Sequence, residues 1–295
     1  MPQDKIDEDI VSEATRRVTE SISQETDFRD QALEDLKFRV GDQWPDKIRR
    51  DRELAGQPVL QFNLIPKFVR QVTGDARQNV PSINVIPVDR FADKDTAKIL
   101  KGMIRHIEYQ SASSDVYVNG LEQAAVIGRG WWQITSEYAD ETTFDQEIKL
   151  KRVENPLSVY VDPMATGPCY EDAEWMCIRE WMNKDTFKRL YPGKQADPDA
   201  LLLAGGHSQD WFSEDSVCIA YYYKKEPVKR TLLHVAISSP TNAPYESLIF
   251  DDDPHLAKLE EFSNIEIIKS REVEAIKVTC HKITGTEEIG VTTEP

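Results

Sequence analysis

The sequence predicts an α+β fold in which N-terminal helices are followed by a mainly antiparallel β region. Up to about residue 129, apolar residues recur every three or four positions, which is the helical period. After Gly128-Arg129-Gly130 the chain changes to short runs rich in β-branched and aromatic residues, separated by turn formers. Most of these runs follow one another without a helix-length connection, which disfavours parallel pairing. We therefore divide the chain into an N-terminal helical arm, residues 1–25, and an α+β domain, residues 26–295, with a helical part (26–129) and a β-rich part (130–295).

Two helices are predicted at the start of the chain. The first carries an apolar residue at every fourth position from Ile6 to Ile22, but this stripe is narrow and flanked by charge. We interpret it as a helix that is ordered by a partner. The second follows Thr26, a suitable N-cap residue, and ends at Gly41, because glycine readily adopts the left-handed conformation that closes a helix.

A third helix is predicted after Asn63, whose side chain can cap it, with Pro66 in the first turn. Its buried stripe is expected to consist of four apolar residues: Ile65, Phe68, Val69 and Val72. Two longer helices follow the extended stretch 82–88. The first is lined by the apolar residues between 99 and 107, and the second runs from 113 to 127.

The last of these helices places small residues at four-residue spacing: Gly120, Ala124 and Gly128. Small residues on one edge allow another backbone to approach closely, but two glycines can equally be a weak point and a C-cap. The sequence leaves both interpretations open.

The β-rich part contains seven predicted strands, at residues 131–138, 144–154, 157–161, 175–181, 217–224, 231–237 and 273–283. The turn formers between them include Asp162-Pro163 and Glu226-Pro227. One short helix, residues 184–190, is predicted from its cap residue Asn183, and residues 195–213 are predicted to form a loop.

Adjacent tryptophans begin the first strand and point to opposite faces. Trp132 shares its face with Ile134 and Tyr138, so we assign it to the core. Trp131 shares the other face with polar residues. It is therefore either covered by a helix of the same chain or available to another subunit.

Charge and composition exclude several classes of protein. The chain has 295 residues, enough for a sizeable core, and 36 Lys and Arg against 52 Asp and Glu give a net charge of −16. This charge argues against a protein that binds DNA generally by neutralising its phosphates. Residues 35–110 hold 14 Lys and Arg against 10 Asp and Glu, a net charge of +4, which leaves −20 on the remainder. The helical region can therefore meet anions, whereas the rest repels them.

Targeting signals and metal-binding cysteine pairs are not evident in the sequence. The N-terminal segment is acidic, and no stretch approaches the roughly 18 uncharged apolar residues of a membrane span. The four cysteines are not spaced for a zinc or redox site, and we interpret them as buried apolar residues in a reducing compartment: Cys169, Cys177, Cys218 and Cys280. We expect a location in the cytoplasm and no membrane partner.

The sequence lacks the common enzyme signatures, including a phosphate-binding loop, a nucleophile elbow and a zinc-protease motif. Asp140, Asp145, Glu147 and Lys149 resemble the carboxylates and lysine of a metal-dependent nuclease, but the alternation also fits a half-exposed strand. The acidic run at residues 251–253 is interpreted as a solvated turn, with a weak metal site as the alternative. The five scattered histidines are interpreted as structural. We predict no enzymatic activity, no catalytic residue, no metal and no cofactor.

Several long stretches resemble the portal proteins of short-tailed bacteriophages related to phage P22. They are Gly41-Asp42-Gln43-Trp44-Pro45, FNLIPKFVRQVTGDARQNVPSINVIPV (62–88), GRGWWQITSEY (128–138), RVENPLSVYVDPMA (152–165) and EWMNKDTFKRLYPG (180–193). The resemblance implies the wing domain of a dodecameric ring at one vertex of the capsid in the virion, assembled in the host cytoplasm. DNA is packaged and ejected through such a ring without sequence-specific binding. The partners implied are the terminase large subunit, capsid or scaffolding protein and tail adaptor proteins.

The sequence stops at Pro295, roughly where the family would continue into the stem, clip and crown. We therefore expect either a fragment or a truncated gene product. The alternatives are a capsid-associated adaptor or binding protein that keeps only the wing fold, and the metal-dependent nuclease described above.

If the chain forms a ring, aromatic and arginine side chains are expected where subunits meet. The candidates are Trp131, Arg70 and Arg77. The two arginines are seven residues apart, and so lie two helical turns apart on one face. There they can pair with acidic groups of a neighbouring subunit. The alternative is an internal Trp131 and two solvated arginines.

Overall fold

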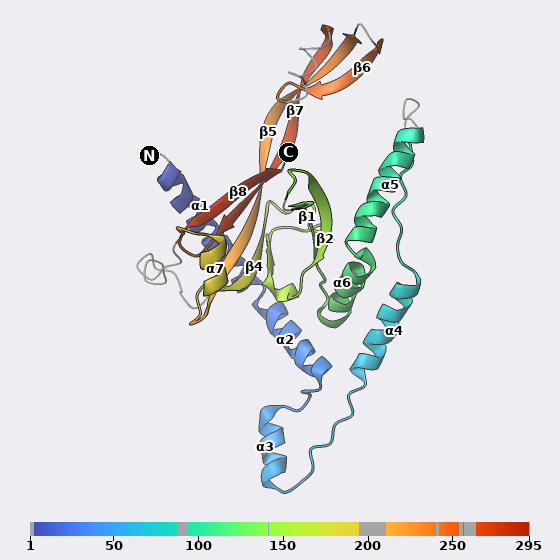
Figure 1. The fold of residues 1–295 in the computed structure, drawn as a ribbon. Coiled ribbons are helices and arrows are strands. Elements are labelled where there is room, and N and C mark those ends of the chain that lie inside the picture. The colour runs from blue at the N-terminus through green and yellow to red at the C-terminus, as the bar shows by residue number, and fades with distance from the viewer. Residues whose placement is uncertain are drawn as a thin grey trace. The chain divides into compact units, whose positions relative to one another are not determined.

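The computed structural model describes residues 3–87, 94–140, 142–194, 211–239, 242–253, 256 and 264–294 (Figure 1). The chain forms two compact units. Unit 1 comprises residues 1–23 and 159–295, and unit 2 comprises residues 24–158. Helices precede antiparallel sheets, which confirms the predicted α+β class. The domain boundaries drawn from the sequence at residues 26 and 130 stay a prediction.

Unit 1 is built on an antiparallel sheet with six strands among the described residues. Their order is β3-β4-β5-β7-β8, with β6 on the remaining part of β5. The strands are β3 (Val159–Val161), β4 (Trp175–Asn183), β5 (Ser216–Ser239), β6 (Asn242–Phe250), β7 (Asn264–Ile283) and β8 (Glu288–Glu294). A short 3-10 helix, Pro156–Ser158, precedes β3 in the chain. Strands β6 and β8 were not predicted from the sequence.

Strand β5 corrects the prediction of two strands separated by a turn at Glu226-Pro227. It runs unbroken for 24 residues, and Pro227 lies opposite Ile276 of β7. The pairing of β5 with β4 ends at Lys224, and its pairing with β6 begins at Leu232. Between these points, the strand pairings of the described residues leave one edge of β5 open. Proline is tolerated there because a free edge does not need its missing N–H donor.

Helix α1 (Gln3–Gln24) packs onto this sheet. Its residues Val11, Ala14 and Val18 are buried in the same apolar cluster as the strand residue Tyr222. The Ser21 hydroxyl donates a hydrogen bond of 3.1 Å to the Val161 carbonyl. The expectation that a partner orders this helix is therefore wrong for the side that carries Val11, Ala14 and Val18, because the chain's own sheet covers that side.

Polar contacts hold the other edge of α1. Arg17 donates to the Tyr222 hydroxyl (2.8 Å), and Lys224 donates to Glu13 (3.0 Å). Burial tends to raise the pKa of Glu13, but Lys224 and Arg17 outweigh it and lower the pKa below its ordinary value. Helix α7 (Lys184–Leu190) follows β4 as predicted, and its cap Asn183 accepts from the backbone N–H of Asp185 at 2.9 Å.

Unit 2 contains five α-helices and a two-stranded ribbon among its described residues. They are α2 (Thr26–Val40), α3 (Asp46–Leu54), α4 (Ile65–Gln78), α5 (Lys94–Gln110), α6 (Ser113–Ile127), β1 (Trp132–Tyr138) and β2 (Gln146–Arg152). Gly41 ends α2 with a φ of 101°, as predicted. Helix α3 was missed because it is dominated by charged residues and has no buried residue to give it an apolar stripe.

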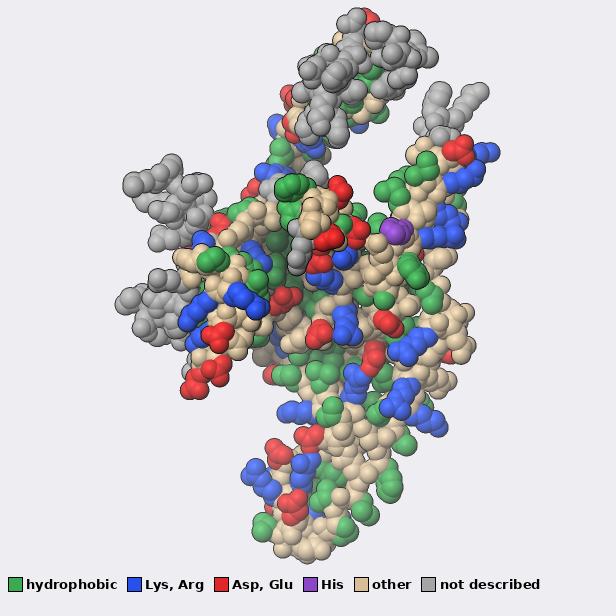
Figure 2. All heavy atoms as spheres, in the orientation of Figure 1, with side chains coloured by type: hydrophobic (Ala, Val, Ile, Leu, Met, Phe, Trp, Pro, Cys, Tyr) green, Lys and Arg blue, Asp and Glu red, His purple; other side chains and the backbone are tan. Residues whose placement is uncertain are grey.

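The helices of unit 2 leave much of their apolar surface uncovered. On α4, Val69 and Thr73 are buried, whereas Phe68 and Val72 are 61% and 45% exposed. The buried stripe predicted for α4 is therefore partly wrong: α4 packs against α6 on one side, and its second apolar edge faces solvent. Ile99 of α5 is exposed as well. Figure 2 shows hydrophobic side chains on the surface of these helices, interspersed with Lys and Arg.

Candidate functional site: the apolar groove and ribbon face of unit 2

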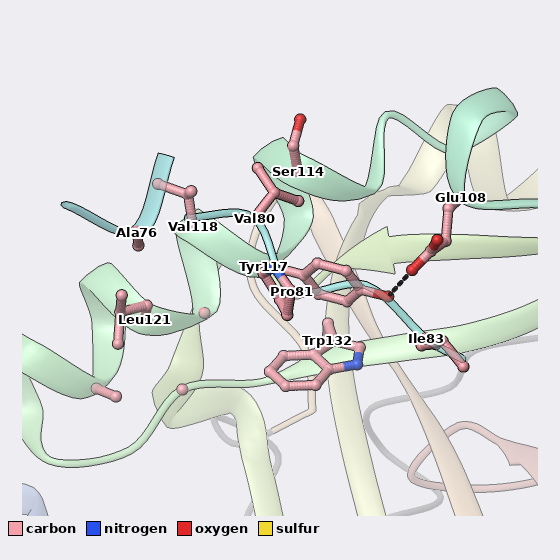
Figure 3. A pocket seen from close by; sticks show the side chains of 13 residues that line it. Ala76, Val80, Pro81, Ile83, Glu108, Ser114, Tyr117, Val118, Leu121 and Trp132 are labelled. Atoms are coloured by element: carbon pink, nitrogen blue, oxygen red, sulfur yellow. Dashed lines mark hydrogen bonds between the residues drawn. The ribbon is translucent and has the colours of Figure 1, made fainter. Parts of the chain in front are cut away.

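An apolar groove of about 500 Å³ lies within unit 2, between α6, the segment that follows α4, and the start of β1 (Figure 3). Val80, Pro81 and Ile83 form one wall, and Leu121 of α6 and Trp132 of β1 contribute to the other sides. The lining is almost entirely apolar. Such a groove can accept apolar side chains, but it offers few polar groups to hold an ion or a charged ligand.

Two glycines allow the walls of the groove to approach each other. A Cβ atom on Gly130 would overlap the carbonyl oxygen of Gly120, and one on Gly120 would lie 2.9 Å from the Trp132 ring. Gly128 has a different role: it closes α6 with a φ of 83°, and its N–H donates to the Ala124 carbonyl at 2.9 Å. Of the two interpretations that the sequence left open, close approach of another backbone applies to Gly120, and the C-cap applies to Gly128.

Two aromatic rings meet at the groove. The rings of Tyr117 and Trp132 are 5.6 Å apart at an interplanar angle of 72°, the edge-to-face arrangement that aromatic pairs favour. The Tyr117 hydroxyl donates to Glu108 at 3.3 Å (Figure 3). Burial first, and then the Glu108 carboxylate, raise the pKa of Tyr117, so the phenol stays protonated and able to donate.

The apolar face of the ribbon continues outward from Trp132. Strands β1 and β2 pair with Ile134 opposite Leu150, and Ser136 opposite Ile148. The exposed fractions are 48% for Trp132, 66% for Ile134, 61% for Tyr138 and 49% for Ile148. We call the side chains on this side, from Trp132 to Tyr138 and from Ile148 to Leu150, the ribbon face.

The assignment of Trp132 to the core is therefore wrong. Helices α5 and α6 contact β2, and the Leu150 N–H donates to Ser111 Oγ at 3.0 Å. The more covered side of the ribbon is the polar one, where Gln133, Thr135 and Glu137 are half-buried. The hydroxyl of Thr135 on that side is buried, and it has no hydrogen-bond partner within the described part of the chain. Alternation on the strand identified the two faces, but it could not show which of them is more covered.

The three predicted interface residues all lie in unit 2. Trp131 is half-buried just before β1, and its N–H donates to Gln123 Oε1 at 3.2 Å. Arg70 and Arg77 are exposed on α4, and the salt bridges formed by the described residues do not include them. Nothing in a single chain tests a contact between subunits, so these assignments stay predictions. The sequence interpretation missed the groove and the exposed ribbon face.

The candidate metal residues do not come together. Glu147 and Lys149 share the polar side of the ribbon, while Asp140 is exposed in the turn beyond it. Asp252 pairs with Arg230 at 2.8 Å, and this hydrogen bond lowers the pKa of its carboxyl. No group of three or more potential metal ligands is found within the described residues.

The cysteine and histidine predictions have mixed outcomes. Cys177 and Cys218 are buried as predicted, but Cys169 is exposed and Cys280 is half-buried, which corrects the interpretation for these two. Two histidines contact glutamates, His234 with Glu246 (3.0 Å) and His281 with Glu288 (2.6 Å). His106 is exposed, whereas His207 and His255 lie outside the described residues.

An α+β chain that leaves so much apolar surface open in one unit fits the class of structural subunits that are completed by assembly. The family model described as "Phage P22-like portal protein" matches residues 15–294, so the chain belongs to this portal family of bacteriophages. The match covers almost all of both units, and it implies an oligomeric ring. No curated protein matches the chain. Among the described residues, no helix is both long and apolar enough to cross a membrane.

Proposed function

We propose that this chain is a structural subunit of a portal ring at one vertex of the phage capsid. DNA enters through the ring during packaging and leaves through it during ejection, and the ring docks the terminase and the tail. The observation that carries the proposal is the family match over residues 15–294. The uncovered apolar surface of unit 2 supports a role in assembly, because surfaces of this kind mark protein contacts.

The charge of the chain supports a conduit rather than a DNA-binding protein. A net charge of −16 disfavours tight, non-specific attachment of DNA, since attachment depends on neutralised phosphates. DNA that must slide gains from weak contacts. We also propose that the chain hydrolyses neither ATP nor DNA, and that a separate motor supplies the energy for packaging.

Immunogold labelling of intact virions with antibodies against the chain tests the location. We expect one labelled vertex per particle, the vertex that carries the tail. Label spread over the whole shell, or absent from it, would contradict the proposal. The conduit role is tested by a stop codon early in the gene: infected cells should then accumulate shells without DNA, and a plasmid copy of the gene should restore filling.

A further inference from the structure

We propose that the groove and the ribbon face of unit 2 form one continuous contact surface for a second copy of this chain, and that unit 1 of that copy is the opposing side. Trp132 joins the two parts, since its ring borders the groove and its strand carries the ribbon face. The inference rests on the proposed function and deepens it, because it names the surface by which subunits meet.

The first argument is the amount of apolar surface. Seven side chains of the groove and ribbon face are 37–66% exposed: Val80, Ile83, Leu121, Trp132, Ile134, Tyr138 and Ile148. At about 200 Å² for a full aromatic side chain and about 100 Å² for an aliphatic one, they leave on the order of 500 Å² open. This value is near the upper end of the largest patch on a typical monomer, and it is a large part of the roughly 800 Å² that each partner contributes to a stable interface.

The second argument is the distribution of these residues between the units. Among the described residues, 23 of the 31 large hydrophobic side chains that are exposed belong to unit 2. The groove and ribbon face are thus part of a unit whose apolar surface is open on several elements. A second copy that stays bound would cover this surface, as is typical of obligate homo-oligomers.

The third argument is charge, which selects unit 1 of the neighbour as the opposing side. Arg77 directly follows Ala76 of the groove lining, and Arg105 lies one helical turn before Glu108. Both arginines are exposed, and the ion pairs of the described residues leave both of them out. Glu108 already accepts the Tyr117 hydroxyl. Asp75 and Asp115 adjoin the lining as well, so the rim carries charges of both signs, and its two arginines can pair with carboxylates of a neighbouring copy.

Unit 1 is rich in carboxylates with which these two arginines can pair. It holds 17 Lys and Arg against 30 Asp and Glu, a net charge of −13, whereas unit 2 has 19 against 22, a net charge of −3. A contact of unit 2 with unit 1 of a neighbour joins two unlike surfaces. A contact between unlike surfaces is heterologous, and heterologous contacts close into rings when the rotation permits.

The test compares association of the full-length chain and its variants by sedimentation velocity and mass photometry. Ile134→Asp places a charge on the ribbon face, and Tyr138→Ser repeats the test at its far end. The matched control is Leu54→Asp on α3, where the side chain is 87% exposed and outside the groove lining. We expect the wild type and the control to associate, and the dissociation constant of each ribbon variant to rise at least tenfold. Monomer melting temperatures should stay unchanged, because these side chains are exposed.

The rim is tested with Arg77→Glu and Arg105→Glu, with Lys47→Glu on α3 as the control. We expect weaker association in both rim variants and a loss of the wild-type dependence on salt. Mixing gives a further check of the unlike contact. An Ile134→Asp chain keeps an intact unit 1, so it should join wild-type chains once and terminate growth, which shortens the oligomers in proportion to its share.

A wild type that stays monomeric at every concentration overturns the inference, as does a ribbon variant that associates as well as Leu54→Asp. Variants that do not shorten wild-type oligomers overturn the heterologous contact. These outcomes are separate from the virion labelling. A labelled vertex with unaffected variants rejects only this surface, whereas association through the surface without a labelled vertex rejects only the portal role.

Discussion

The two units of the chain bury apolar side chains to very different extents. In unit 1, Tyr222, Phe187 and Ile219 are 0–2% exposed, and α1 adds Ala14 at 0%. In unit 2, the residues buried on α2, α4 and α5 are mostly small, and side chains as large as Phe68 remain open. Unit 1 therefore has the core of an ordinary domain, whereas unit 2 keeps its larger apolar groups at the surface.

This difference shows that burial in one chain does not measure how complete a fold is. Many of the exposed apolar residues of unit 2 lie on a helix or strand, as Phe68, Ile99 and Ile134 do, so the local structure there does not depend on covering them. What the open surface lacks is a second layer. The inferred contact with another copy would supply that layer, and the following experiments test the contrast directly.

The largest effect is expected from Phe187→Ala in unit 1. The ring is 2% exposed and packs within the main apolar cluster, so its removal should cost about 3–5 kcal/mol in the free energy of unfolding. The matched change in unit 2 is Phe68→Ala, at a ring that is 61% exposed, where we expect less than about 1 kcal/mol. Urea unfolding of the monomer measures both. Equal losses would break the contrast between the units.

A medium effect is expected from Gly130→Ala in unit 2. The added methyl group would overlap the Gly120 carbonyl oxygen, so the walls of the groove must separate, at a cost of about 1–3 kcal/mol. The control is Gly102→Ala on α5, where an added Cβ meets no atom within 4 Å beyond the helix's own backbone, and we expect it to stabilise by about 0.5–1 kcal/mol. Thermal melting distinguishes the two signs. A neutral Gly130→Ala would show that the groove is looser than described.

The smallest effect is expected from acid, and it should act on unit 1. The backbone N–H groups of Thr166 and Gly167 donate to Asp172, and they lower the pKa of its carboxyl to about 2. A lowered pKa stabilises the fold above the ordinary value of 3.8, and this contribution is lost as the pH falls towards 2. In Asp172→Asn, the melting temperature should therefore depend less on pH between these two values than it does in the wild type. Parallel curves for variant and wild type would contradict it.

The sequence predicted the features that depend on local chemistry. Gly41 and Asn183 each identified a helix end, because left-handed glycine and a side-chain cap act within a few residues. The resemblance of several stretches identified the family. The charge difference along the chain also pointed to basic helices, and the arginines Arg77 of α4 and Arg105 of α5 are exposed.

What the sequence could not predict depends on contacts between distant segments. Alternation assigned Trp132 and Ile134 to one face of a strand, but only contacts with distant segments decide which face is covered. Pro227 was interpreted as a turn because its partner strand lies about fifty residues further along the chain. The groove requires Gly120 and Gly130 to meet, which neither residue indicates alone.

The position of α1 has a consequence for how the protein is made. The helix belongs to unit 1, yet all of unit 2 is synthesised before the strands that cover it. Its contact between Ser21 and Val161 spans 140 residues, which takes the ribosome roughly 7–30 s at about 5–20 residues per second. During that time the apolar side of α1 has no sheet to pack on, whereas unit 2 is a continuous segment that can fold as it emerges. A nascent chain therefore presents the groove before unit 1 is complete, while the apolar side of α1 stays exposed until the strands that cover it have been synthesised.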